Sequence, residues 1–123
     1  MAVIKVDELA GEIVLAIRAY TEDVSEAIDQ AARDTAKALA KDLRETSPKK
    51  TGEYAKGWTH RKEAPGNYRV YNKKKPQLTH LLEHGHAKAG GGRVEGIPHI
   101  KPARDRHIPQ FEKKVRQILE RGG

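Results

Sequence analysis

Residues 78–103 read LTHLLEHGHAKAGGGRVEGIPHIKPA, and the rest of the chain is organised around this stretch. It combines a short apolar helix predicted over residues 77–83, a flexible glycine-rich loop at 89–92 and a proline-bounded segment that leads into a last helix. Four of the six histidines of the chain lie in it, namely His80, His84, His86 and His99. The stretch is therefore either a chemical site or a piece of scaffold, and we interpret it as scaffold.

The strongest sign of chemistry is the pentapeptide at residues 80–84, which fits the H-x-x-E-H pattern of inverted zinc peptidases. In that pattern two histidines one helical turn apart bind zinc, and the glutamate acts on the bound water. Here Gly85 ends the helix at once, and no downstream acidic helix motif supplies a third ligand. The candidate third ligands are His86, His99 and His107. We therefore expect no metal, no cofactor and no catalytic residue. The weaker alternative is a zinc-dependent hydrolase that uses His80, Glu83 and His84.

Composition narrows the class of protein. The chain has 123 residues, enough for one domain that folds without a metal or a disulfide, and it contains no cysteine. Its longest apolar run, residues 13–17, is far shorter than the roughly 20 residues of a membrane span. We expect a soluble protein that is made and used without export. Aromatic residues are only 5% of the chain, which suggests that packing against other subunits completes its apolar surface.

Charge is distributed unevenly along the chain. Residues 1–46 carry six lysines or arginines against ten acidic residues, a balance of −4, whereas residues 47–123 carry eighteen against seven, a balance of +11. Such a dipolar chain suits head-to-tail contacts between copies, or contact with nucleic acid on one face, and solubility alone is the plainer explanation. The lysines and arginine that could meet phosphate or an acidic partner are Lys73, Lys74, Lys75, Lys88 and Arg93.

A long amphipathic helix is predicted over residues 7–45. Proline is absent from this range, and apolar residues recur in steps of three and four. The positions on this stripe are Leu9, Ile13, Ile17, Tyr20, Val24, Ile28, Ala31, Thr35, Ala38 and Leu39. An unbroken helix of this length would measure about 58 Å, against about 35 Å for a compact domain of this size. We therefore expect it to break around residues 20–25 or to project onto a neighbour.

Two strands and a closing helix follow. Pro48 ends the long helix, and Thr51-Gly52 makes a turn. Strands are predicted over residues 53–62 and 68–72, paired antiparallel through a hairpin connection at 64–67. The last helix is predicted to begin near Pro102, with a kink or a new start at Pro109.

In this order, the elements resemble the neck proteins of long-tailed bacteriophages, the head–tail joining or tail-completion family that includes lambdoid gene-product-ten-like morphogenesis proteins and minor tail protein Z. The resemblance covers nearly the whole chain. The matching residues are Pro48, Thr51 and Gly52, then Leu82, Glu83 and Gly85, then Pro98, Ile100, Pro102 and Ala103.

The resemblance implies a single α+β domain over residues 1–123, in which a long N-terminal helix and a C-terminal helix pack on a small antiparallel sheet. It implies a non-enzymatic virion component, assembled in the host cytoplasm, whose copies form a ring that completes the tail end. The implied partners are other copies, the head connector or adaptor and the tail-tube proteins, with at most weak DNA contact and no membrane. The alternative is a small basic nucleic-acid-binding protein.

Overall fold

The structure is a computed structural model that describes residues 4–6, 12–15, 21–49 and 52–122. Its elements follow in the order β1 (Ile4–Val6), β2 (Glu12–Leu15), α1 (Glu22–Thr46), α2 (Glu53–Lys56), β3 (Trp58–Ala64), β4 (Asn67–Asn72), α3 (Leu78–His84), β5 (Gly85–Ala87), β6 (Arg93–Glu95) and α4 (Ile100–Arg121).

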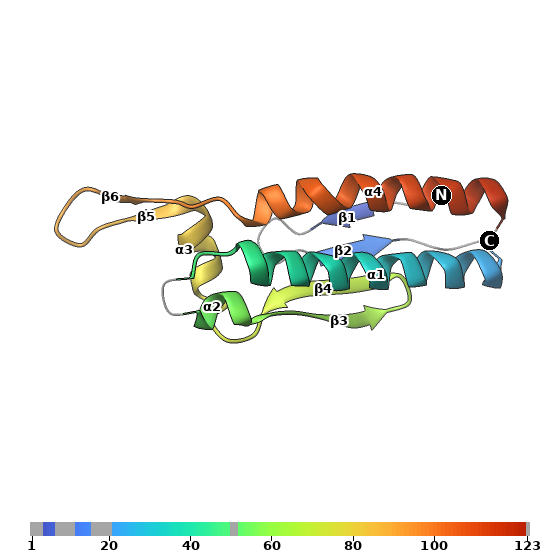
Figure 1. Cartoon of the computed structure of the whole chain (residues 1–123), viewed down its shortest axis with the longest axis horizontal. Coiled ribbons are helices and arrows are strands. Elements are labelled where there is room, and N and C mark those ends of the chain that lie inside the picture. Colours follow the sequence, from blue (N-terminus) through green and yellow to red (C-terminus); the bar gives the residue numbers. More distant parts are fainter. Residues whose placement is uncertain (1–3, 7–11, 16–20, 50–51, 123) are drawn as a thin grey trace.

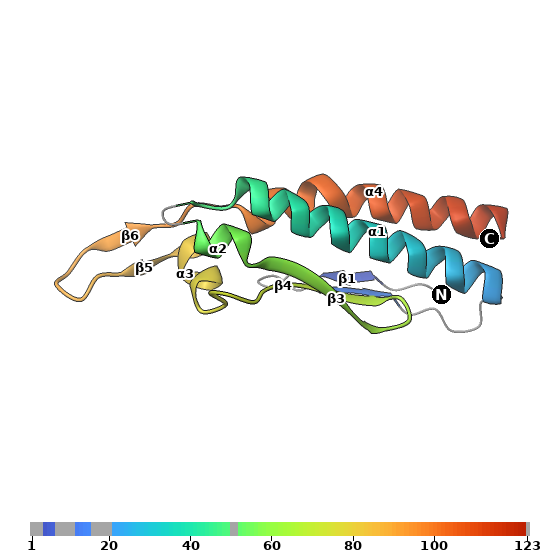
Figure 2. The ribbon, with the colours of Figure 1, turned by 60° about the horizontal axis from the view of Figure 1, so that its bottom comes forward.

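Two layers make up the body of the molecule. Helices α1 and α4 lie side by side and run in opposite directions, and below them lies an antiparallel sheet with strand order β1-β2-β4-β3 (Figures 1 and 2). Strands β5 and β6 form a separate two-stranded ribbon that extends beyond one end of the body (Figure 1). The predicted α+β fold, with a long first helix and a closing helix on a small antiparallel sheet, is confirmed.

The core lies between these layers and depends on small side chains. Alanines 32, 36 and 40 of α1 are completely buried, and they allow α4 and the sheet to approach closely. Around them pack larger apolar residues from both layers, which are Val24, Ile28, Leu39, Leu43, Tyr68, Val70, Phe111, Val115 and Ile118. Thr35 and Ala38, which were predicted to lie on the inward stripe, are half-buried and exposed respectively.

The prediction of one helix over residues 7–45 is wrong in its first part. Residues 12–15 form β2, which pairs with β1 on one side and with β4 on the other. A short apolar run fits a helix and a strand equally well by periodicity, so the strands that pair with it decide, and one of them, β4, lies more than fifty residues away. Leu9, Ile17 and Tyr20 of the predicted stripe lie outside the described residues.

Helix α1 begins where a break was expected. The side-chain oxygen of Thr21 accepts a hydrogen bond from the backbone N–H of Val24 at 3.2 Å, and Glu22 and Asp23 place negative charge in the first turn. The 25 residues of α1 span about 38 Å, which suits a domain of this size.

The strand predicted over residues 53–62 is wrong in its first four residues. Residues 53–56 form the single turn α2, because Gly52 before it has a φ of +85°, a left-handed conformation that redirects the chain. Strand β3 follows and pairs antiparallel with β4 through the Pro65-Gly66 turn, as predicted. Tyr54 reaches the core from the helical turn, and its ring meets that of Trp58 edge to face at 5.7 Å between centroids.

The predictions about the C-terminal third are partly wrong. The glycine-rich loop predicted at residues 89–92 is the turn of a hairpin, and the two strands that flank it, β5 and β6, were not predicted. Leu81, expected to pack inward with Leu78 and Leu82, is exposed. Helix α4 begins at Ile100, close to the predicted start near Pro102. It continues through Pro109, so of the two predicted alternatives the new start is wrong. Pro109 is exposed there, so water can bond the carbonyl group that the proline leaves without a helical donor.

Candidate assembly site

The residues singled out in the sequence meet where the β5–β6 hairpin joins the body, a junction we call the hairpin root. The hairpin leaves α3 at Gly85, whose φ is +80° and whose added Cβ would overlap the carbonyl oxygen of Val94. The backbone N–H of Ile97 donates to the carbonyl of Leu82 at 2.7 Å, so the returning strand is tied to the last turn of α3. A residue with a side chain at position 85 would force these two strands apart.

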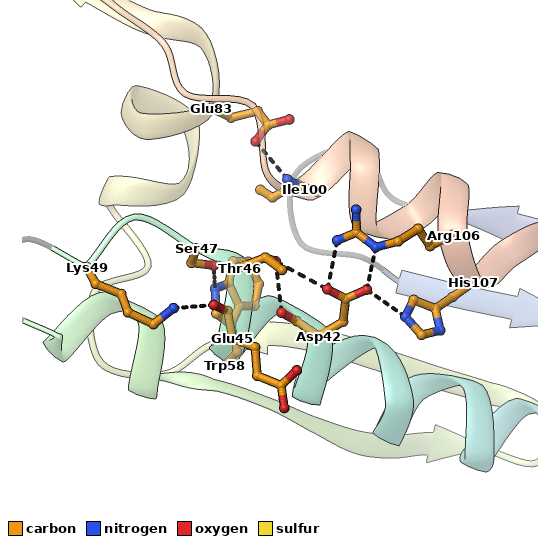
Figure 3. A network of polar contacts seen from close by, with 10 residues as sticks. All are labelled: Asp42, Glu45, Thr46, Ser47, Lys49, Trp58, Glu83, Ile100, Arg106 and His107. Carbon is orange, nitrogen blue, oxygen red and sulfur yellow. Dashed lines mark hydrogen bonds and ion pairs between the residues drawn. The ribbon is translucent and has the colours of Figure 1, made fainter.

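Glu83 caps helix α4 from outside that helix. Its Oε1 accepts hydrogen bonds from the backbone N–H groups of His99 and Ile100, both at 2.8 Å, and its Oε2 accepts one from Lys101 at 3.1 Å. The next residue, Pro102, has no N–H, and the N–H of Ala103 donates to the carbonyl of His99 at 3.2 Å. The free N–H groups at the start of α4 are therefore bonded to one buried carboxylate, and Pro102 has no N–H that needs a partner. Figure 3 shows Glu83 reaching from α3 to Ile100.

The charge of Glu83 is stabilised despite its burial. Burial alone would raise the pKa of this carboxyl group, but three backbone N–H groups together outweigh that effect, and the pKa lies below its ordinary value. The carboxylate is thus held in its ionised, accepting form.

His99 links the root to α2. Its Nδ1 lies 2.8 Å from the carbonyl oxygen of Ile97 and 3.0 Å from Oε1 of Glu83. Since both neighbours are acceptors, we assign the proton to Nδ1, which leaves Nε2 to accept from the hydroxyl of Tyr54 at 2.7 Å. Burial, followed by the charge of Glu83, raises the pKa of Tyr54, so its hydroxyl remains a donor. Because every polar group of this buried trio has a partner, the trio locks α2, α3 and α4 together.

The basic turn at residues 73–75 is fixed by buried Asn72. The amide of Asn72 donates to the carbonyl of Tyr54 at 2.6 Å, and its Oδ1 accepts from the backbone N–H groups of Lys74 and Lys75 at 3.2 and 2.9 Å. The backbone of the turn is therefore ordered by the core, while the side chains of Lys73 and Lys74 are exposed.

Polar contacts also join the two long helices next to the root (Figure 3). Asp42 of α1 accepts from Arg106 of α4 through two nitrogens, at 2.7 and 2.8 Å, and lies 2.8 Å from Nε2 of His107. The hydrogen bond from Arg106 is the largest cause of a pKa for Asp42 of about 2, with His107 adding to it against the opposing effect of burial. A two-pronged arginine pair of this kind fixes the rotation of one helix against the other.

The C-terminal end of α1 is held by Trp58. Ser47 donates its backbone N–H to Leu43 at 3.0 Å, and its buried hydroxyl accepts from the indole nitrogen of Trp58 at 2.8 Å. Arg44 donates to the carbonyl of Trp58 at 2.8 Å. Pro48 follows directly, so the predicted end of the helix is confirmed.

The structure thus brings together two of the three sequence motifs at the root. Leu82, Glu83 and Gly85 of α3 and β5 meet Ile100 and Pro102 of α4. Pro98 lies in the exposed connection before them, and Pro48 and Gly52 belong to the chain between α1 and α2. Thr51 lies outside the described residues.

Sequence reasoning missed Tyr54, His99 and Asp42 as partners across elements. An aromatic residue two positions after a glycine and a histidine between two prolines were visible in the sequence, but their pairing depends on the fold. Of the residues predicted to meet phosphate or an acidic partner, Lys88 and Arg93 lie on the hairpin, where Arg93 donates to the carbonyl of His84 at 2.5 Å.

The geometry gives no support to the zinc-peptidase alternative. The rings of His80 and His84 lie 5.0 Å apart between centroids, but the carboxylate of Glu83 is occupied by hydrogen bonds from the start of α4. Among the residues that the structure describes, no three histidine, aspartate or glutamate side chains are placed to hold a metal ion. Within the same part of the chain, no helix is long and apolar enough to cross a membrane.

These features define an α+β protein, in which Glu83 and His99 make buried contacts between elements and a hairpin projects from the body. Residues 11–85 match the family described as "Bacteriophage HK97-gp10, putative tail-component". The match covers more than half of the chain, and the protein belongs to this family of phage tail components. No curated protein and no solved structure matches the chain.

Proposed function

We propose that this protein is a non-enzymatic component of the phage neck, whose copies form a ring that completes the tail end and joins it to the connector of the capsid. Membership of a family of tail components is the observation that carries the proposal. It supports a place in the virion and partners among the phage structural proteins. The partners in this proposal are further copies of the protein, the head connector or adaptor, and the tail tube.

The geometry of the root supports a docking role. Gly85 and Glu83 hold the base of the hairpin in a fixed position relative to the body. A partner that binds the exposed strands would therefore bind a preformed surface. In the proposed ring, the motif residues of the root fix the orientation of the hairpin. This role needs no catalytic group. Many weak contacts repeated around a ring add up to a stable joint.

A nucleic-acid-binding module is the second candidate, because the net charge of +7 is concentrated in the C-terminal half of the chain. The exposed lysines of the turn at 73–75, with Lys88 and Arg93, could contact a phosphate backbone. In a neck protein, DNA contact through these side chains should be weak, should fall steeply with salt and should ignore base sequence. A titration against duplex DNA at two salt concentrations separates the candidates: tight binding that persists above physiological salt would favour the nucleic-acid module.

The direct test of the neck role is electron microscopy of particles assembled without this gene product. The proposal predicts filled heads and finished tails that fail to join. Normal virions in that preparation would overturn it.

A further inference from the structure

The exposed apolar side chains of the described residues are concentrated at the hairpin end of the molecule. Four large apolar side chains are exposed among the described residues. Three of them belong to the hairpin and its flanks: Leu81, Val94 and Ile97, the last with 57% of its surface exposed. The fourth, Leu119, lies near the end of α4. Apolar side chains grouped on a projecting element are typical of a protein–protein contact rather than of a phosphate contact.

The same end of the molecule is positively charged. Residues 73–97 carry five lysines or arginines against two glutamates, and one of these, Glu83, is buried at the root. Lys88 is exposed at the hairpin tip, and Arg93 is exposed on β6. The surface that binds the hairpin must therefore combine apolar contact with negative charge.

A surface with negative charge and some apolar area lies at the opposite end of the folded molecule. Helix α1 begins at the end far from the hairpin in both views (Figures 1 and 2). Residues 21–30 carry four carboxylates and no lysine or arginine. Two shallow hollows flank these turns, with Glu26 and Gln30 lining both of them.

Among the described residues, carboxylates are the only charged groups that line the two hollows. One hollow is also lined by Glu22, Asp29 and Pro65, and the other by Asp23, Ala27 and Gly122. Asp29 is already engaged by Lys62 at 3.1 Å. The last turns of α4 carry lysines and arginines at this end, but none of them lines a hollow. Glu22, Asp23 and Glu26 have no ion-pair partner among the described residues, and Pro65 and Ala27 add apolar surface beside them.

We propose that the β5–β6 hairpin of one copy docks on the first turns of α1 of a second copy. The inference rests on the proposed ring and names its contact. Because the two surfaces differ and lie at opposite ends of an elongated molecule, the contact is head to tail, and successive copies can close into a ring. Val94 and Ile97 would contact the apolar edge of the hollows, while Lys88 and Arg93 would face Glu26 and its neighbours.

Substitutions that reverse the charge of one or the other surface test this docking in the purified protein. The variants Lys88→Glu and Glu26→Lys each reverse one surface at an exposed position, and Lys37→Glu, on the middle of α1, is the matched control. Sedimentation at low salt should show self-association of the wild type that weakens at least tenfold in either single variant and stays within twofold in the control. The double variant, and a one-to-one mixture of the two single variants, should recover association.

Several results would overturn the docking. They are a monomeric wild type at the highest concentration tested, single variants that associate like the control, and a double variant that stays weak while circular dichroism shows it folded. Loss of DNA binding in Lys88→Glu without any change in association would assign the hairpin to nucleic acid. Failure of the neck proposal is seen separately, as normal virions without the gene product, and does not depend on this measurement.

Discussion

The root and the tip of the hairpin contain similar residue types but behave as opposites. At the root, Gly85 is enclosed by the backbone of the opposite strand, and the carboxylate of Glu83 has three N–H partners. At the tip, a Cβ added to Gly90 would meet nothing within 4 Å, and the neighbouring side chains are exposed. Glycine is thus required by the fold at position 85 but not at position 90, where the surface is open. The difference lies in the surroundings of each residue and not in the residue type.

The largest expected effect is at Glu83. Glu83→Ala removes the acceptor of three backbone N–H groups at the start of α4, and unsatisfied buried donors should lower the free energy of unfolding by about 3–5 kcal/mol. Glu95→Ala, the same change on the exposed hairpin strand, should cost no more than about 0.5 kcal/mol. Urea unfolding of both variants measures the difference, and equal losses would contradict the capping role.

A smaller effect is expected at Gly85. Gly85→Ala places a methyl group against the carbonyl of Val94 at a backbone conformation that residues with side chains rarely adopt, so it should destabilise by about 2–3 kcal/mol. Gly90→Ala at the tip should change stability by less than about 0.5 kcal/mol. Thermal melts of the pair check this, and a neutral Gly85→Ala would show that the root is not held as described.

A pH-dependent effect is expected at Asp42. Its folded pKa of about 2 lies below the ordinary 3.8, so its contribution is complete above about pH 4 and disappears as the pH falls towards 2. Since Arg106 is half exposed, the contribution is about 1–2 kcal/mol rather than the full value of the shift. Asp42→Asn should therefore lower the unfolding free energy at pH 7, and the gap from wild type should narrow below pH 4.

Asp105→Asn is the control for this measurement. It removes the exposed pair with Lys101, in which both side chains are more than 60% exposed, and should change stability by less than about 0.5 kcal/mol at either pH. If the difference in unfolding free energy between wild type and Asp42→Asn does not depend on pH, the contact between Asp42 and Arg106 does not stabilise the fold through its charges.

Local patterns in the sequence were enough to predict some of these elements. The 3.6-residue stripe predicted α1 from Val24 onward, Pro48 predicted its end, and Pro65-Gly66 predicted the β3–β4 turn. These signals depend on neighbours within one or two turns of the chain.

Non-local contacts explain what was missed. Residues 12–15 are a strand because β4, far along the chain, offers an edge, and residues 85–95 form a ribbon because Gly85 lets two short strands approach. The capping of α4 by Glu83 joins residues sixteen to eighteen positions apart. The sequence shows that Glu83 lies near the end of the short helix before Gly85, but it does not show that Glu83 caps a different helix.

Deletion of residues 89–92 tests most directly whether the root serves the fold and the tip serves docking. The excised residues contribute nothing to the core, so the free protein should keep its unfolding free energy to within about 0.5 kcal/mol. Phage that carry the deletion should accumulate separate heads and tails. A deletion variant that unfolds, or one that stays folded and joins heads to tails at the normal rate, would contradict the account.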